Sequence, residues 1–338
     1  MSSETMACDT SMSNMVSKSE FLYDCLTTMK LQECHKDYLC SDYLYQRPER
    51  SDNKKMRREN SSNCVSSANS DFSAERIEMV YRQKICEWMY RVVDHFQVSR
   101  DLVSISISYL DRYLAATGAG CNTRVFRLAS VAALYIACKQ FDMSRSFIKA
   151  RTLSELSRSE FSDEDIETME MQLLSTLKWR MNPPTAPCFV RHIFTILVPR
   201  DADSMFPNML EDSLYFTDLA LCDYFFVTKR SSVVAVSSMI NAIKKRCNFG
   251  NLEQDEASFL VKHICRICNV SDSCIDVKAS QERLWKIYTE SDEFKELVSN
   301  TLTVVEEPPI TQCFLASQTF CSSSMVDSPV SVAKNVFN

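Results

Sequence analysis

The chain has 338 residues, enough for two domains that each bury a core, and 45% of them are hydrophobic, as in an ordinary globular protein. It contains only three glycines, whereas a phosphate-binding loop needs several at fixed offsets, so the composition argues against a nucleotide-binding enzyme. A formal net charge of −6 argues against a nucleic-acid-binding surface as the main function.

The sequence predicts an intracellular protein. No N-terminal apolar run resembles a signal peptide, and no stretch approaches the length of a membrane span, so we expect no contact with membranes. In such a chain we expect the 16 cysteines to be reduced thiols. The basic cluster Lys54-Lys-Met-Arg-Arg58 is either a nuclear import signal or a solvated run of charge, and we expect the protein in nucleus and cytoplasm.

The composition of residues 1–73 does not favour a packed hydrophobic core. They mix Ser, Asn, Met and Cys with charged residues, and the stretch 61–73 holds six serines in thirteen residues. Asp37 to Tyr45 could form a short helix or a docking element, and otherwise we expect this region to be mostly disordered.

Helical periodicity begins after Ser73, the expected N-cap of a first helix. Its apolar side chains recur every three or four residues and draw one face: Ile77, Tyr81, Ile85, Trp88, Val92 and Phe96. Further helices are predicted over 100–116, 125–139, 147–158 and 163–179, the third of them apolar nearly all round and the last capped by Ser162.

Asn182-Pro-Pro184 cannot continue a helix and marks a boundary. A second set of five helices is predicted over 186–198, 209–227, 231–247, 254–268 and 274–294. The fold class predicted is therefore all-α, with two tandem five-helix lobes at 74–181 and 185–295. A Ser/Thr-rich tail over 296–338, which holds the single Ser-Pro pair, is expected to be disordered.

No catalytic motif is present, and the chain has only four histidines. The best metal candidates are His263, Cys265 and Cys268, with Cys274 nearby. Their helical spacing places Cys265 and Cys268 on one inward face, and no second ligand pair is obvious. We therefore expect no metal, no cofactor and no enzymatic activity.

Two pairs of charges lie among apolar helical residues. Arg82 flanks the stripe of the first helix and Asp111 lies inside the second, so a bidentate ion pair between them could lock these helices together. Lys139 ends the third helix and Glu170 interrupts the apolar run of the fifth. Spacing alone leaves two readings of this second pair equally open: a structural salt bridge, or a half-buried pair presented to a partner's backbone.

Five separated positions and their surroundings resemble the cyclin box, and the chain is similar to cyclins over 75–180 strongly and over 185–295 more weakly. The five characteristic positions are Arg82, Asp111, Leu128, Lys139 and Glu170. The surrounding matches are Ile85 and Trp88 after Arg82, the run Tyr109-Leu-Asp-Arg-Tyr-Leu114, Ala137-Cys-Lys139, and Leu177-Lys-Trp179.

The resemblance implies two stacked five-helix lobes that bind and activate a cyclin-dependent Ser/Thr protein kinase as a heterodimer. Such a regulatory subunit has no chemistry of its own and controls cell-cycle progression. Lys139 and Glu170 match the charged pair that hydrogen-bonds backbone around the kinase's mobile regulatory helix.

Many cyclins also dock Arg-x-Leu peptides of substrates or inhibitors on a patch of the first helix. The matching positions here are Tyr81, Lys84, Ile85, Trp88, Arg91, Phe126 and Arg127. Lys84 replaces an apolar residue, and Arg91 stands where an acid would attract the peptide's arginine. We therefore predict weak or altered Arg-x-Leu docking at the patch around Trp88.

Three alternatives remain. The first is a transcriptional cyclin of a polymerase-tail kinase. The second is a cyclin-fold general transcription factor that binds DNA. The net negative charge of the chain and the lack of a basic stripe in 75–295 argue against it, so we expect no direct nucleic-acid contact. The third is a helical scaffold with no kinase, in which Lys139 and Glu170 form an ordinary salt bridge.

Overall fold

The computed structural model of the chain describes residues 20–43, 68–117, 123–141, 148–157, 159–197, 208–249, 252–271, 273–292 and 295. In these residues the regular secondary structure is helical, which confirms the all-α class. The first group of helices comprises α2 (Ala68–His95), α3 (Asp101–Thr117), α4 (Thr123–Phe141), α5 (Ala150–Leu156) and α6 (Asp163–Thr176). The second comprises α7 (Ala186–Leu197), α8 (Met209–Cys222), the short 3₁₀ helix η2 (Tyr224–Phe226), α9 (Ser231–Phe249), α10 (Gln254–Ile267) and α11 (Ile275–Glu290).

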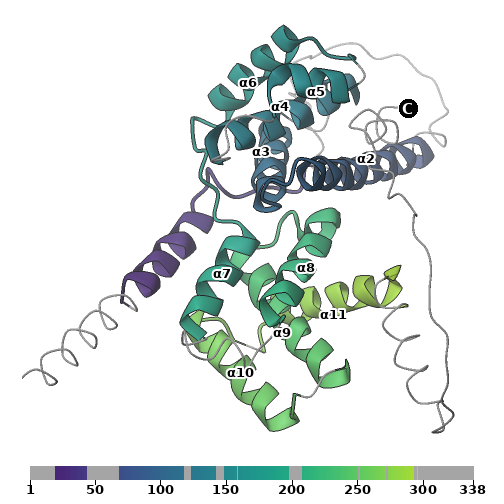
Figure 1. Ribbon diagram of the computed structural model, residues 1–338. Helices are drawn as coiled ribbons and strands as arrows, with labels where there is room; N and C mark the ends of the chain where they lie inside the picture. The colour runs from purple at the N-terminus through teal and green to yellow at the C-terminus, as the bar shows by residue number, and fades with distance from the viewer. Residues whose placement is uncertain are drawn as a thin grey trace, which may run out of the picture.

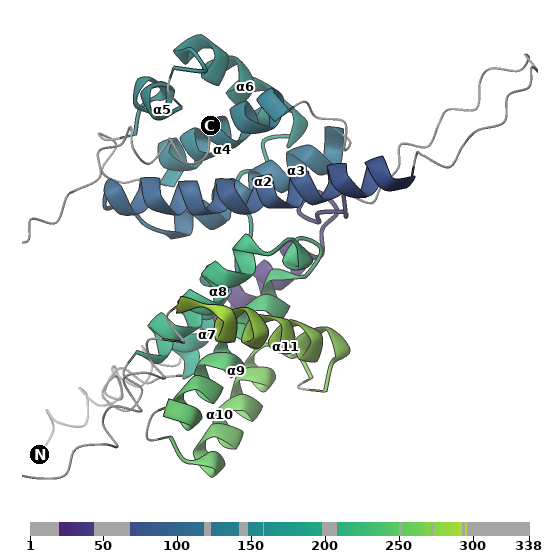
Figure 2. The same ribbon diagram turned by 90° about the vertical axis from the view of Figure 1, so that its right-hand side faces the viewer.

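The two groups lie one above the other, and α2 runs along the junction between them (Figures 1 and 2). We call the upper group the first lobe and the lower group the second lobe. Helices α2 and α3 of the first lobe contact α8 of the second. None of the described helices combines the length and apolar character needed to cross a bilayer.

Each lobe is built around one central helix rich in small residues. In the first lobe α4 packs against both α3 and α6, and its buried side chains include Ala129, Ala132, Ala133 and Ala137. In the second lobe α9 packs against α7, α8, α10 and α11, and every residue from 232 to 243 is buried. Small side chains let neighbouring helix backbones approach closely, which explains why Ala- and Ser-rich segments lie at both centres.

Helix α6, which carries Glu170, begins at a complete capping box. The Ser162 hydroxyl accepts from the Asp165 amide at 3.1 Å, and the Asp165 carboxylate accepts from the Ser162 amide at 3.0 Å. The helix N-terminus predicted at Ser162 is therefore confirmed. By contrast, α2 begins at Ala68, five residues earlier than the N-cap predicted at Ser73.

The expectation that residues 1–73 are mostly disordered, apart from a short helix or docking element at 37–45, is wrong for residues 20–36. Residues 20–33 form a helix, and residues 34–43 follow as turns and irregular backbone (Figure 1). Leu26, Glu33 and Tyr43 of this stretch are buried against the rest of the chain. The segment is ordered by contacts with residues of both lobes that lie far away in sequence. The basic cluster 54–58 and the tail 296–338 lie outside the described residues.

We expect Ser162→Ala to lower the free energy of unfolding by about 1 kcal/mol, because the Asp165 amide loses its side-chain acceptor. Urea denaturation followed by circular dichroism measures the change. Ser175→Ala, at an exposed position in the last turn of the same helix, serves as the control and should change stability by less than about 0.5 kcal/mol. Equal effects of the two substitutions would contradict the role of the cap.

Candidate functional site

Lys139 and Glu170 meet at the contact of α4 and α6. Lys139 lies in the last turn of α4 and Glu170 in the middle of α6. The Lys139 ammonium donates to both carboxylate oxygens of Glu170, at 2.7 Å to Oε1 and 3.0 Å to Oε2. The Lys139 side chain is 50% exposed, whereas that of Glu170 is only 12% exposed. The carboxylate is thus held inside the lobe and the ammonium lies at its surface.

The surroundings of Lys139 keep its ammonium charged. Partial burial opposes the charged form, but the hydrogen bond and charge of Glu170 outweigh it and raise the pKa of Lys139. The ammonium also lies 4.8 Å from the centre of the Tyr135 ring, a favourable contact for a cation. At neutral pH the Lys139 side chain is therefore an ammonium held in an ion pair.

Exposed apolar side chains lie next to both members of the pair in sequence. Phe141 is the last residue of α4, two positions beyond Lys139, and Met171 adjoins Glu170; they are 36% and 58% exposed. An ammonium has three donors, so Lys139 can donate to a further acceptor while it remains paired with Glu170. Charged groups beside exposed apolar surface can bind a partner's backbone, and the same geometry is also that of an interhelix salt bridge.

Arg82 and Asp111 form a second pair, and this one is buried. Arg82 Nε and Nη2 each donate to one carboxylate oxygen of Asp111 at 2.8 Å, in the bidentate geometry expected from the sequence. Their side chains are 4% and 8% exposed. Burial disfavours the charge of Arg82, but Asp111 outweighs it and holds the pKa of Arg82 well above its usual value.

The pair also binds groups that sequence reasoning missed. Arg82 Nη1 donates to the Leu221 carbonyl of the second lobe at 2.7 Å, and the Tyr43 hydroxyl donates to Asp111 at 3.0 Å. The sequence around Arg82 does not predict a contact with a residue 139 positions away. Leu128, the remaining characteristic position, is partly buried and packs against the core of the first lobe.

The predicted docking patch is not assembled as an exposed apolar surface. Ile85 and Trp88 are 1% and 0% exposed and belong to the core of the first lobe. Tyr81 and Phe126 are partly buried, and Arg127 forms an ion pair with Glu160 at 3.1 Å. The two exposed side chains of the set are both cationic: Lys84 and Arg91.

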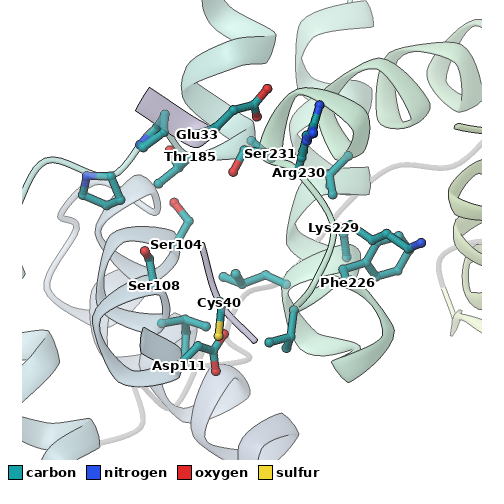
Figure 3. Close-up of a pocket in the computed structure, with 18 of the residues that line it drawn as sticks. Glu33, Cys40, Ser104, Ser108, Asp111, Thr185, Phe226, Lys229, Arg230 and Ser231 are labelled. Carbon is teal, nitrogen blue, oxygen red and sulfur yellow. The ribbon is translucent and has the colours of Figure 1, made fainter. Parts of the chain in front are cut away.

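A cavity of about 140 Å³ lies between the two lobes (Figure 3). Ser104, Ser108 and Asp111 line it from α3, Phe226 and Arg230 from the second lobe, and Cys40 from the N-terminal segment. It does not include Lys139 or Glu170. Within the part of the chain that the structure describes, no group of three or more His, Cys, Asp or Glu side chains is placed to hold a metal ion. Of the metal candidates, Cys265 and Cys268 are buried.

Comparison with known proteins gives matches to cyclins. Residues 52–182 match the family described as "Cyclin, N-terminal domain". Cyclin-A1-2 of Arabidopsis thaliana is 26% identical over 163 residues, 48% of this chain and 35% of the relative. Cyclin-O protein A of Xenopus laevis is 28% identical over 178 residues, 51% of this chain and 47% of the relative.

The G1/S-specific cyclin-E of Caenorhabditis elegans is 30% identical over 105 residues, 31% of this chain and 20% of the relative. The chain thus spans less than half the length of these curated relatives. Among solved structures, a viral cyclin from herpesvirus saimiri aligns with a TM-score of 0.46 and 17% identity, over 62% of this chain and 88% of that chain.

We expect Asp111→Asn to lower the free energy of unfolding by about 3–5 kcal/mol, because it leaves the buried charge of Arg82 without a counter-charge. Urea denaturation measures the change. The matched control is Asp94→Asn, whose carboxylate pairs with Arg100 at 2.8 Å while both side chains are about half exposed. Its loss should cost about 0–1 kcal/mol. A small effect of Asp111→Asn would contradict the locking role of the buried pair.

Proposed function

We propose that this chain, which belongs to the cyclin family, binds and activates a cyclin-dependent Ser/Thr protein kinase as its non-catalytic regulatory subunit, and so controls cell-cycle progression. One observation carries the proposal. The Lys139–Glu170 pair, at two characteristic positions of the cyclin box, is fixed in geometry and yet keeps half of the lysine side chain at the surface.

The contact follows from the chemistry of the two groups. Lys139 donates to a backbone carbonyl of the kinase, and Glu170, which already orients Lys139, accepts from a backbone amide. Fixing the two groups before binding lowers the entropy lost on association. We place this contact in the first lobe, for which we propose the boundaries 74–181, with a second lobe over 185–295.

Activation is then a shift between two kinase conformations. The bound lobe holds the kinase's mobile regulatory helix inward, where its glutamate pairs with the lysine that positions ATP. The chain needs no catalytic group for this, because it acts only by binding the active conformation more tightly than the inactive one.

We further propose a cell-cycle kinase rather than a polymerase-tail kinase as the partner. The name of the nematode relative ties that protein to the G1/S step. The basic cluster at 54–58 supports import into the nucleus, so we propose that the complex works in nucleus and cytoplasm.

We expect the Lys139→Ala/Glu170→Ala variant to copurify with much less active kinase than the wild type does. In affinity purification from the source cells the amount of active kinase should fall at least about tenfold. Helical circular dichroism should remain unchanged, because removing both partners leaves no unpaired charge in the lobe. The matched control is Arg151→Ala/Glu155→Ala, which removes an exposed ion pair of α5 in the same lobe.

A charge-swapped variant separates a kinase contact from a salt bridge. Lys139→Glu/Glu170→Lys keeps an ion pair within the lobe but reverses the donor and acceptor offered to the kinase. We expect it to lose kinase as the double alanine variant does. Full recovery by the swapped variant would show that only the ion pair matters. A wild-type chain that recovers no kinase would overturn the proposed function itself.

We expect a standard Arg-x-Leu peptide to bind the chain weakly or not at all in a calorimetric titration. Lys84 and Arg91 repel the peptide's arginine, and the apolar side chains Ile85 and Trp88 are buried. Lys84→Leu/Arg91→Glu restores an apolar residue and an acid, and should bind the peptide more tightly. Tight binding by the wild type would contradict the predicted change in docking.

A further inference from the structure

Residues 20–43 lie across the junction of the two lobes and bind both of them. The helix 20–33 lies beside α7, and the residues that follow it pass between the lobes (Figures 1 and 2). Gln32 donates to the carbonyl of Asn182 in the linker between the lobes at 2.7 Å. Lys30 donates to the carbonyl of Cys268 at the end of α10. The segment is therefore tied to the body at several separate points.

The first strong tie is at the beginning of α9, the central helix of the second lobe. The Glu33 carboxylate accepts from the Ser232 amide at 2.9 Å and from the Ser232 hydroxyl at 2.6 Å. Glu33 is 5% exposed. The first amides of a helix lack partners within the helix and carry the positive end of its dipole, so a carboxylate is well suited to cap them. Glu33 thus caps α9 from a segment 199 residues away in sequence.

The second tie is at the buried ion pair of the first lobe. The Tyr43 hydroxyl donates to Asp111 at 3.0 Å, and its ring packs edge-on against Tyr224 with 5.3 Å between the ring centres. The Tyr224 hydroxyl in turn donates to Asp42 at 2.8 Å. Since Arg82 bonds both Asp111 and the Leu221 carbonyl, the segment and both lobes meet in one cluster.

Arg112 adds a third tie, next to the second. Its Nε donates to the Asp37 carbonyl at 3.0 Å, and Tyr38 places its ring 5.0 Å from the guanidinium. Burial lowers the pKa of Arg112. Its Nη2 donates to the Arg180 carbonyl of the first lobe at 2.9 Å, whereas its Nη1 has no hydrogen-bond partner among the described residues. The contacts from the segment therefore contribute to stabilising this buried cation alongside Arg180.

We propose that residues 20–43 act as an intramolecular clasp that fixes the second lobe against the first, with Glu33 and Tyr43 as its two latches. The lobes also contact each other directly, through the ion pairs Arg100–Asp218 and Arg191–Asp101. The clasp adds a further restraint, because one latch holds the central helix of the second lobe and the other holds the ion pair of the first. The proposal does not depend on the kinase function.

The test is a distance measurement in the full chain. Spin labels are placed by bio-orthogonal residues at Lys149, at the start of α5, and at Lys262 on α10, both exposed and in different lobes. Pulsed electron resonance gives the distribution of distances between them. We expect the Glu33→Ala/Tyr43→Phe variant to show a distribution at least about twofold broader than the wild type.

The matched control is Glu20→Ala/Tyr23→Phe, which makes the same changes at exposed positions of the same segment and should leave the distribution unchanged. Hydrogen exchange gives a second readout, in which the Ser232 amide should exchange about tenfold faster in the clasp variant. Unchanged distances and exchange would overturn the clasp. If the double variant loses its helical signal, the distance distribution is measured in the Tyr43→Phe variant, which removes only one hydroxyl. This distribution should also be broader than that of the wild type, and an unchanged one would overturn the clasp.

Discussion

The buried pair of Arg82 and Asp111 is the interaction on which the arrangement of the chain depends. It joins α2 to α3 within the first lobe through two hydrogen bonds of 2.8 Å. The remaining donor group of Arg82 reaches the Leu221 carbonyl of the second lobe, and Asp111 also receives the Tyr43 hydroxyl. Three parts of the chain that are distant in sequence thus share one pair of charges.

Such a pair is tolerated in the interior only when its hydrogen bonds are made. Removing two charges from water costs several kcal/mol per ion, and mutual attraction repays this only with good geometry and further partners. Here the further partners are the groups that join the lobes and the N-terminal segment. The pair therefore adds specificity more than stability: a different placement of the second lobe or of residues 20–43 would leave a buried charge short of partners.

Local patterns in the sequence were enough to predict most helices, the Ser162 cap and the meeting of Arg82 with Asp111. Apolar spacing determines which face of a helix is buried. Two opposite charges on buried faces are expected to pair, because an unpaired buried charge is costly. The helix at 20–33 was missed although Leu22, Leu26 and Met29 recur at helical spacing. Its partners are loops and helix ends more than 100 residues away, which local spacing does not reveal. Trp88 was expected at a docking patch, yet the same periodicity that placed it on a helical face also places it in the core.

The two charge pairs of the first lobe have the same chemistry and differ in exposure, and this difference separates their roles. In the Arg82–Asp111 pair both side chains are nearly fully buried, so every donor and acceptor must be satisfied within the chain. In the Lys139–Glu170 pair the carboxylate is held inside while half of the lysine side chain stays in solvent. The pair also matters inside the lobe, because loss of Lys139 would leave the mostly buried Glu170 carboxylate without its counter-charge. The Lys139 ammonium nevertheless keeps a donor to spare at the surface, so it can bind an acceptor outside the chain while it remains paired with Glu170.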